Sequence, residues 1–243
     1  MTHSKLIIQL CLLILIDFKT HAQVPSTYTV VENWDDSLKL ISREGKFGLF
    51  NVSFNEAIVL PKYDKIEPFG KLDDRLAVVH HKGKLGIIDK NGFEILKPGF
   101  DEFGIPNELK EGWLIVKKKG KIGIVTLPDG WIILDPQYKS IEPFGKIHQS
   151  LALVKKDNLY GLMDESAFLS LSCQYDEIRP FGELHPERAL VKRKGKWGLI
   201  GLEGGEMISC EYDKIESYSN ESFKGTKGNE IVYFDTFGLE FIP

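Results

Sequence analysis

The sequence predicts an all-β protein assembled from tandem repeats, because two series of residues recur with one period. The last glycine of a Gly-Lys-x-Gly segment recurs at spacings of 38, 37, 38 and 37 residues, at Gly48, Gly86, Gly123, Gly161 and Gly198. The copy that ends at Gly161 is degenerate and reads Asn-Leu-Tyr-Gly. An aromatic residue, mostly followed by aspartate, recurs at spacings of 37, 38, 37 and 37, at Tyr63, Phe100, Tyr138, Tyr175 and Tyr212. Repeats of this period are typical of stacked arrays or closed rings.

Composition agrees with β structure. Glycine accounts for 23 of the 243 residues and aromatic residues for 11%, a balance typical of turn-rich sheets rather than helix bundles. The chain is 42% hydrophobic and 27% charged, which excludes a disordered chain and a membrane protein with several spans. Three cysteines and six histidines leave little material for a metal framework or a disulfide scaffold.

The repeat extends toward both ends of the chain. Tyr28 and Trp34 correspond to Tyr63 and Phe69, and the last copy keeps its apolar runs but lacks the Gly-Lys signature. We therefore expect six units of about 37 residues, which start near Tyr28, Tyr63, Phe100, Tyr138, Tyr175 and Tyr212.

Within a unit, the local sequence first predicts a β-hairpin. Short apolar runs at 76–79, 113–116, 151–154 and 189–191 lead into a Lys-Gly or Asp-Asn pair. A second set of runs follows directly, at 85–88, 122–125, 160–163 and 197–200. Glycine at the second turn position supplies the positive φ that a two-residue hairpin needs.

A second hairpin and a corner complete the unit. Turn pairs at Asn91-Gly92, Asp129-Gly130 and Gly204-Gly205 precede third strands such as 93–96 and 131–134. The Pro-Phe-Gly segments at 68–70, 143–145 and 180–182 are expected at corners or edges, because proline cannot donate to a central ladder.

The repeats can be arranged in two ways. In an open, twisted array of β-meanders, neighbouring units supply the core and the atypical first and last units act as caps. A closed propeller-like ring of about six blades is the alternative. We favour the open array, because the tight hairpins and short corners leave fewer long strands than a propeller blade needs.

The N-terminus has the order of a secretory signal peptide. His3 and Lys5 precede an apolar run at 6–16, and the small residue Ala22 follows. We expect residues 1–22 to be a signal peptide and residues 23–243 to form the repeat domain, with no transmembrane segment in the mature chain. The protein is then exported to the periplasm, the outer surface or the medium.

The repeat resembles the bacterial WG-repeat (KWG) family, whose name comes from a Trp-Gly pair that follows a lysine. The resemblance covers Tyr28 to Pro243 and rests on the Gly-Lys-aromatic-Gly turn, the Tyr-Asp-x-Ile step and the Leu-Ala-x-Val strand in register. Only Trp197-Gly198 is a true Trp-Gly, which favours core packing over ligand stacking at that position. The resemblance implies no catalytic residues.

The candidate binding surface is a basic ridge. Cations gather at one hairpin tip of successive units, and repetition is expected to align them as a ridge made of Lys82, Lys84, Lys117, Lys118, Lys119, Lys121, Lys155, Lys156, Lys192, Arg193, Lys194 and Lys196. Such a ridge could hold an anionic partner on an otherwise acidic chain of net charge −4. Alternatively, these lysines only keep exposed strands from pairing with other chains.

The recurring acidic residues suggest a structural role more than a catalytic one. Aspartates recur at Asp64, Asp101, Asp176 and Asp213, with Glu67, Glu142 and Glu216 nearby, and paired acids could cleave glycosides. However, Lys139 occupies the same position in one copy, so we expect these aspartates to accept hydrogen bonds from turn backbones instead. The histidines and glycines indicate no metal, nucleotide or other cofactor site.

Cys173 and Cys210 lie 37 residues apart, each two residues before a repeat tyrosine. They are a candidate disulfide in an oxidising compartment, with two buried free thiols as the alternative.

These observations predict an exported, non-enzymatic repeat scaffold that binds a protein or an anionic envelope glycan. A carbohydrate-active enzyme that uses carboxylates on one rim is the alternative. Nucleic acid is not an expected partner, given the signal peptide and the acidic net charge.

Overall fold

A computed structural model describes residues 23–243 as a chain of β-strands and turns without helices. The predicted signal peptide, residues 1–22, lies outside the described residues. The strands form six antiparallel sheets of four strands, and each sheet takes strands that follow one another in the chain. The chain divides into two compact units, one ending at Pro68 and the other spanning Phe69–Pro243. The predicted all-β repeat class is therefore confirmed.

We name the sheets A to F in chain order. Sheets A to C contain β1 (Thr29–Asn33), β2 (Leu38–Arg43), β3 (Lys46–Asn51) and β4 (Glu56–Tyr63); β5 (Lys65–Ile66), β6 (Leu76–His81), β7 (Lys84–Asp89) and β8 (Glu94–Phe100); and β9 (Glu102–Phe103), β10 (Trp113–Lys118), β11 (Lys121–Thr126) and β12 (Ile132–Tyr138).

Sheets D to F repeat this plan. They contain β13 (Ser140–Ile141), β14 (Leu151–Lys156), β15 (Leu159–Asp164) and β16 (Leu171–Tyr175); β17 (Glu177–Ile178), β18 (Arg188–Arg193), β19 (Lys196–Gly201) and β20 (Glu206–Tyr212); and β21 (Lys214–Ser219), β22 (Ser222–Lys227), β23 (Glu230–Asp235) and β24 (Glu240–Phe241).

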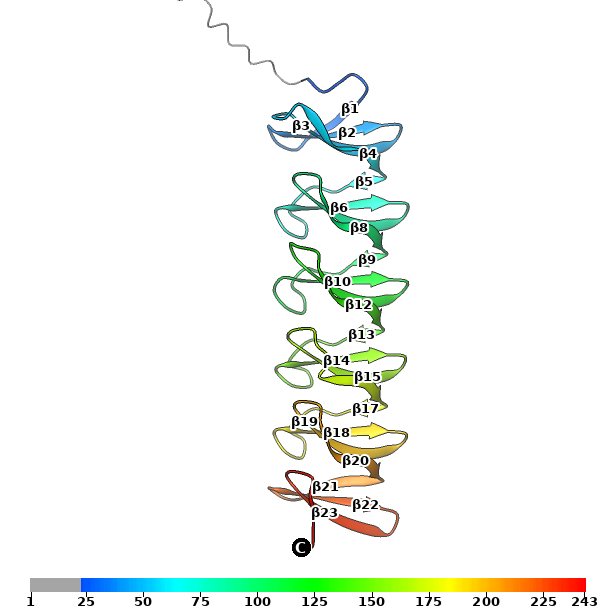
Figure 1. Cartoon of the computed structure of the whole chain (residues 1–243), viewed down its shortest axis with the longest axis vertical. Coiled ribbons are helices and arrows are strands. Elements are labelled where there is room, and N and C mark those ends of the chain that lie inside the picture. Colours follow the sequence, from blue (N-terminus) through cyan, green and yellow to red (C-terminus); the bar gives the residue numbers. More distant parts are fainter. Residues whose placement is uncertain (1–22) are drawn as a thin grey trace, which may run out of the picture. The chain divides into compact units, whose positions relative to one another are not determined.

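Within Phe69–Pro243 the sheets form an open stack. They follow one another along one axis in chain order, so sheet F lies at the end far from β6 and the stack does not close on itself (Figure 1). The open array is therefore the correct alternative, and the closed ring is not formed. The Pro-Phe-Gly corner at 143–145 lies between β13 and β14, as expected.

The core of this stack lies between successive sheets. In β11, Val125 packs with Leu76 and Ile87 of the preceding sheet, whereas its neighbour Ile124 packs with Ala152 of the following sheet. In β19, Ile200 and Leu199 alternate in the same way between the preceding and following neighbours. Both faces of an inner sheet are thus buried, which explains why the strands read as continuous apolar runs.

The first hairpins are tight two-residue turns. Both turn residues have positive φ, for example 51° and 72° at Lys82-Gly83 and 49° and 70° at Asp157-Asn158. This is the type I′ geometry, which matches the twist of paired strands. The predicted hairpins are confirmed, including the copy that lacks glycine.

The second glycine of each signature lies under a bulge in the last strand. Leu85 pairs with Phe100 and Ile87 with Leu96, so Gly86 alone faces three residues centred on Pro98. A Cβ on Gly86 would lie 2.6 Å from the Leu96 carbonyl oxygen. At the equivalent glycines of the other signatures, an added Cβ would lie 2.2 to 2.6 Å from a carbonyl oxygen of the last strand. These glycines are Gly48, Gly123, Gly161 and Gly198. No side chain fits there, which explains the recurring glycine.

The last strand is longer than the sequence predicted. The expected strands 93–96 and 131–134 are observed as β8 and β12, which continue through the bulge to Phe100 and Tyr138. Pro98 and Pro136 lie within these bulges, and a bulged edge strand tolerates proline.

The bulge predicts a large effect of adding a single methyl group in sheet E. Gly198→Ala places a Cβ 2.6 Å from the Ile208 carbonyl oxygen, so we expect unfolding free energy to fall by about 1–3 kcal/mol or more, as overpacking does. Chemical denaturation measures the change. Gly205→Ala is the matched control, because its Cβ would meet nothing within 4 Å and its φ is not positive. Equal stability of the two variants would contradict this account.

Candidate binding surface at the hairpin tips

The predicted ridge residues lie at the first hairpins of four sheets. These are the hairpins β6–β7, β10–β11, β14–β15 and β18–β19, whose tips lie one above another along one side of the stack (Figure 1). Because the sheets repeat with little change, equivalent side chains are presented in series along this edge. The geometry is that of a surface, not of a pocket.

An aspartate joins successive hairpin tips. The Asp101 carboxylate pairs with the Lys84 Nζ of sheet B and accepts a hydrogen bond of 2.5 Å from the Lys119 backbone N–H of sheet C. Asp213 likewise pairs with the Lys196 Nζ and accepts a hydrogen bond of 2.8 Å from the Gly228 backbone N–H. Each aspartate therefore links two sheets, which explains why Gly-Lys and Tyr-Asp recur together.

The same contact occurs in part at the remaining junctions. Asp176 accepts a hydrogen bond of 3.2 Å from the Gly195 N–H, and Asp64 pairs with the Lys46 Nζ at 2.5 Å. The expectation that these aspartates accept hydrogen bonds from turn backbones is therefore confirmed at Asp101, Asp176 and Asp213.

The junction between sheets C and D has its charges exchanged. Lys139 stands where other copies have aspartate, and the next hairpin tip is Asp157-Asn158 in place of Lys-Gly. The Lys139 Nζ donates to the Asn158 Oδ1 at 3.3 Å, and the Lys121 Nζ lies 3.5 Å from the Asp157 Oδ1. The two departures from the repeat thus compensate each other.

Part of the ridge is already paired with acidic side chains. Five of its cations are in ion pairs, namely Lys84, Lys117, Lys121, Arg193 and Lys196, with Asp101, Glu102, Asp157, Glu206 and Asp213. Lys118, Lys155 and Lys192 lie over the rings of Phe100, Tyr160 and Trp197, and Lys156 donates to Gln137. The lysines Lys118, Lys119 and Lys194 are exposed and make no ion pair with the described residues.

The junction carboxylates are poorly suited to acid catalysis. The Lys84 ammonium and the Lys119 N–H hold the pKa of Asp101 below its usual value, and the Gly228 N–H and Lys196 do the same to the pKa of Asp213. A glycosidase general acid needs the opposite shift. Among residues 23–243, no group of three or more His, Cys, Asp or Glu side chains could hold a metal ion.

Cys173 and Cys210 are free thiols at the same position of successive sheets, so the candidate disulfide is not formed. Both lie in the bulge, where Pro61, Pro98 and Pro136 stand in other copies. The Cys173 Sγ points to the Val154 carbonyl at 3.9 Å, and the Cys210 Sγ to the Val191 carbonyl at 3.8 Å, each within its own sheet. This common orientation along the stack keeps the two thiols apart.

Sequence reasoning missed a row of exposed rings at the second hairpins. Phe93, Trp131 and Phe168 are 68%, 72% and 70% exposed, and each follows a residue with positive φ. Their spacings of 38 and 37 residues were a usable signal, but strand prediction placed these residues in strands. Antiparallel strands put successive turns at opposite ends, so the second hairpins lie on the side of the stack away from the first hairpins (Figure 1).

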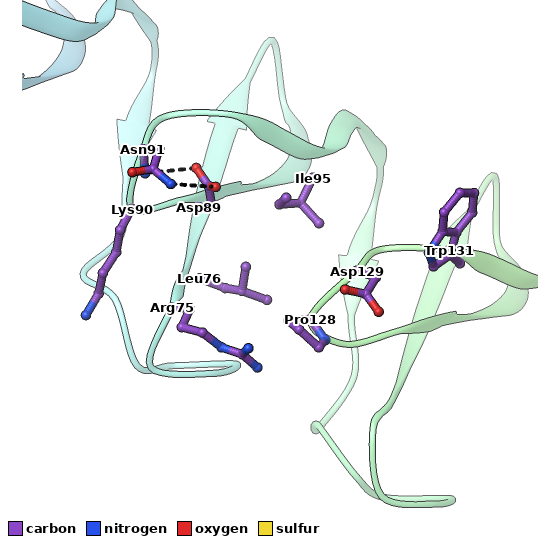
Figure 2. A pocket seen from close by; sticks show the side chains of 9 residues that line it. All are labelled: Arg75, Leu76, Asp89, Lys90, Asn91, Ile95, Pro128, Asp129 and Trp131. Carbon is purple, nitrogen blue, oxygen red and sulfur yellow. Dashed lines mark hydrogen bonds between the residues drawn. The ribbon is translucent and has the colours of Figure 1, made fainter.

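A cleft of about 490 Å³ lies beside this row, between the second hairpins of sheets B and C. Figure 2 shows Asp89 and Asn91, joined by hydrogen bonds, on one hairpin and Asp129 and Trp131 on the next. Arg75 reaches the cleft from the turn before β6. Polar groups and an exposed ring therefore converge here.

A family model described as WG containing repeat matches residues 86–121, 128–160, 160–197 and 197–223. A search of curated proteins finds no match. The described residues contain no helix that is long and apolar enough to cross a membrane.

Several solved structures are similar at low identity. The chain is 15% identical to a eukaryotic initiation factor, with a TM-score of 0.29. The aligned region covers 85% of this chain and 62% of the initiation factor chain. It is 11% identical to the extracellular domain of a protein described as a hybrid two-component system from B. thetaiotaomicron, with a TM-score of 0.39 and coverages of 89% and 32%. For Hsv2 of Kluyveromyces lactis the identity is 12%, the TM-score 0.26 and the coverages 86% and 91%. These TM-scores are low, and the likenesses carry no argument about function.

The exchanged charges between sheets C and D predict a compensating set of mutations. Lys139→Asp brings a carboxylate toward Asp157, so we expect unfolding free energy to fall by up to about 1 kcal/mol, as for exposed pairs. Adding Asp157→Lys and Asn158→Gly recreates the arrangement around Asp101, and we expect stability to return. Denaturation curves measure both effects, with Asn158→Gly alone as the control for the turn. Additive losses in the triple variant would contradict the compensation.

The environment of Cys173 and Cys210 predicts slow alkylation of both thiols in the folded protein. Burial and the neighbouring Glu206 raise the pKa of Cys210 to about 11, and burial raises the pKa of Cys173. At pH 8 only about one Cys210 side chain in a thousand is a thiolate. Alkylation followed by peptide mass spectrometry should show slow labelling of both thiols that becomes fast in urea. Rapid labelling of native Cys210, or a peptide pair linked through sulfur, would disprove this description.

Proposed function

Because the chain belongs to the WG-containing repeat family, we propose that it is an exported, non-enzymatic scaffold that binds a protein or an anionic envelope glycan. The observation that carries this proposal is the alignment of equivalent hairpin tips along one side of Phe69–Pro243. A series of like surfaces suits an extended partner, which can contact several sheets at once and gain affinity through multivalency.

The cations without acidic partners define where an anionic partner would bind. Lys118 and Lys119 lie on one hairpin tip and Lys194 on another, and all three are exposed. The ion-paired lysines contribute less, since a partner would have to displace Asp101 or Asp213. Binding would therefore be local at these tips rather than uniform along the ridge.

The alternative, a carbohydrate-active enzyme with carboxylates on one rim, has less support. The recurring aspartates are used to join sheets, and the pKa values of Asp101 and Asp213 are lowered. An active site also needs unlike residues that converge, whereas Asp101 and Asp213 make equivalent contacts at two different junctions.

Charge reversal tests the proposal. We expect the variant Lys118→Glu, Lys119→Glu, Lys194→Glu to lose retention on envelope fractions. Raised salt should likewise weaken the retention of the wild-type protein. A control of equal charge change is Lys71→Glu, Lys97→Glu, Lys146→Glu, at exposed lysines outside the tips, of which Lys146 is paired with Glu142. Unchanged retention of the first variant would overturn binding at the ridge.

A further inference from the structure

Each exposed ring at the second hairpins belongs to a residue whose carbonyl closes the turn, although the turn before Trp131 is one residue longer than the turns before Phe93 and Phe168. The N–H of the residue that opens each turn donates to the carbonyl of the ring-bearing residue, at 3.0 Å for Phe93, 2.8 Å for Trp131 and 2.9 Å for Phe168. The opening residues are Asp89, Thr126 and Asp164. Three successive sheets therefore present an aromatic side chain from the same backbone position.

The base of this row is tightly packed. A Cβ on Gly130, just before Trp131, would lie 2.7 Å from the Ile95 carbonyl oxygen of the preceding sheet. A turn held so closely against its neighbour has little freedom. The rings belong to none of the described core clusters, so packing does not explain them. Aligned exposed rings on a rigid base are typical of a binding surface.

The cleft lined by Trp131 indicates what kind of ligand fits. Its charged residues are balanced, with Arg75 and Lys90 against Asp89 and Asp129. Arg75 is already paired with Asp73, its Nε lying 2.9 Å from the Asp73 Oδ1. The exposed Asp129 carboxylate accepts no hydrogen bond from the described residues. This balance favours an uncharged ligand that offers hydrogen-bond donors.

A sugar chain combines the two properties that the surface requires. One face of a pyranose presents C–H groups, which pack flat on an aromatic ring, and its hydroxyl groups donate to carboxylates and accept from amides and guanidinium groups. An apolar peptide would use the rings but offer no side-chain donor to the Asp129 carboxylate. A charged polymer would meet as many like as unlike charges in the cleft.

We propose that the ring row of Phe93, Trp131 and Phe168 binds a neutral polysaccharide along the stack, with its hydroxyl groups in the cleft beside Asp129. This inference rests on the proposed role as a binding module, but it names another surface and an uncharged ligand. Stacked sheets lie about 10 Å apart, so two rings are farther apart than one sugar, and the chain length of the ligand matters. Several weak stacking contacts on one chain then add up through multivalency.

Affinity gel electrophoresis of the full chain tests the proposal. The gels contain one neutral polysaccharide each, namely hydroxyethylcellulose, laminarin, galactomannan or dextran, and a further gel contains anionic polygalacturonate. We expect retardation in at least one neutral gel that persists at about 0.5 M salt. The variant Phe93→Ala, Trp131→Ala, Phe168→Ala should weaken that binding at least about tenfold.

Two controls separate this inference from the ridge. Ile105→Ala with Tyr218→Ala removes exposed apolar side chains elsewhere and should leave retardation unchanged. The variant Lys118→Glu, Lys119→Glu, Lys194→Glu should also bind the neutral gel normally, even if it loses its anionic partner. Trp131→Phe keeps a ring and should retain most of the binding, which separates stacking from a fold defect.

Three outcomes would overturn the inference. These are no retardation in any neutral gel, retardation that survives removal of the three rings, and self-association through the rings in place of sugar binding, seen by analytical ultracentrifugation. Retardation in polygalacturonate alone, lost in the charge-reversal variant, would also overturn it while leaving the ridge proposal standing.

Discussion

The close crossing of each bulge over a glycine is the constraint on which sheets A to E depend. At Gly86, Gly123 and Gly198, the carbonyl of the last strand lies where a Cβ would stand. The crossing carries the strand on to Phe100, Tyr138 or Tyr212, and these rings enter the core shared with the following sheet. One missing side chain thus fixes both the shape of a sheet and the place where the next one begins.

Hydrogen bonds at the junctions from sheet B onward then hold each sheet against the next one. Backbone N–H groups of Asp101, Lys139, Asp176 and Asp213 donate to the first hairpin of the next sheet, whatever their side chain. The carboxylates add a contact to the tip of that hairpin. Five of the twelve ridge cations are paired with carboxylates of the fold, whereas Lys118, Lys119 and Lys194 make no ion pair with the described residues and are available for recognition.

The fold could be predicted from sequence because its signals are local and repeated. Turn glycines, apolar runs and the period define the hairpins and the number of sheets. The bulge was not predictable in this way, since Pro98 and Pro136 read as the ends of strands rather than as its centre. The ridge was located, but its neutralisation by Asp101 or Glu206 depends on contacts between distant residues. The ring row was missed because Phe93 and Trp131 look like strand residues.

The exchanged pair at Lys139 and Asp157 gives one junction an identity in a chain whose other junctions are nearly alike. Chains of similar modules risk docking one copy out of step while they fold. A shift by one module would bring Lys139 to a Lys-Gly tip, or an aspartate to Asp157, and like charges would oppose it. A single junction with exchanged charges thus favours the correct register of all the sheets in the stack.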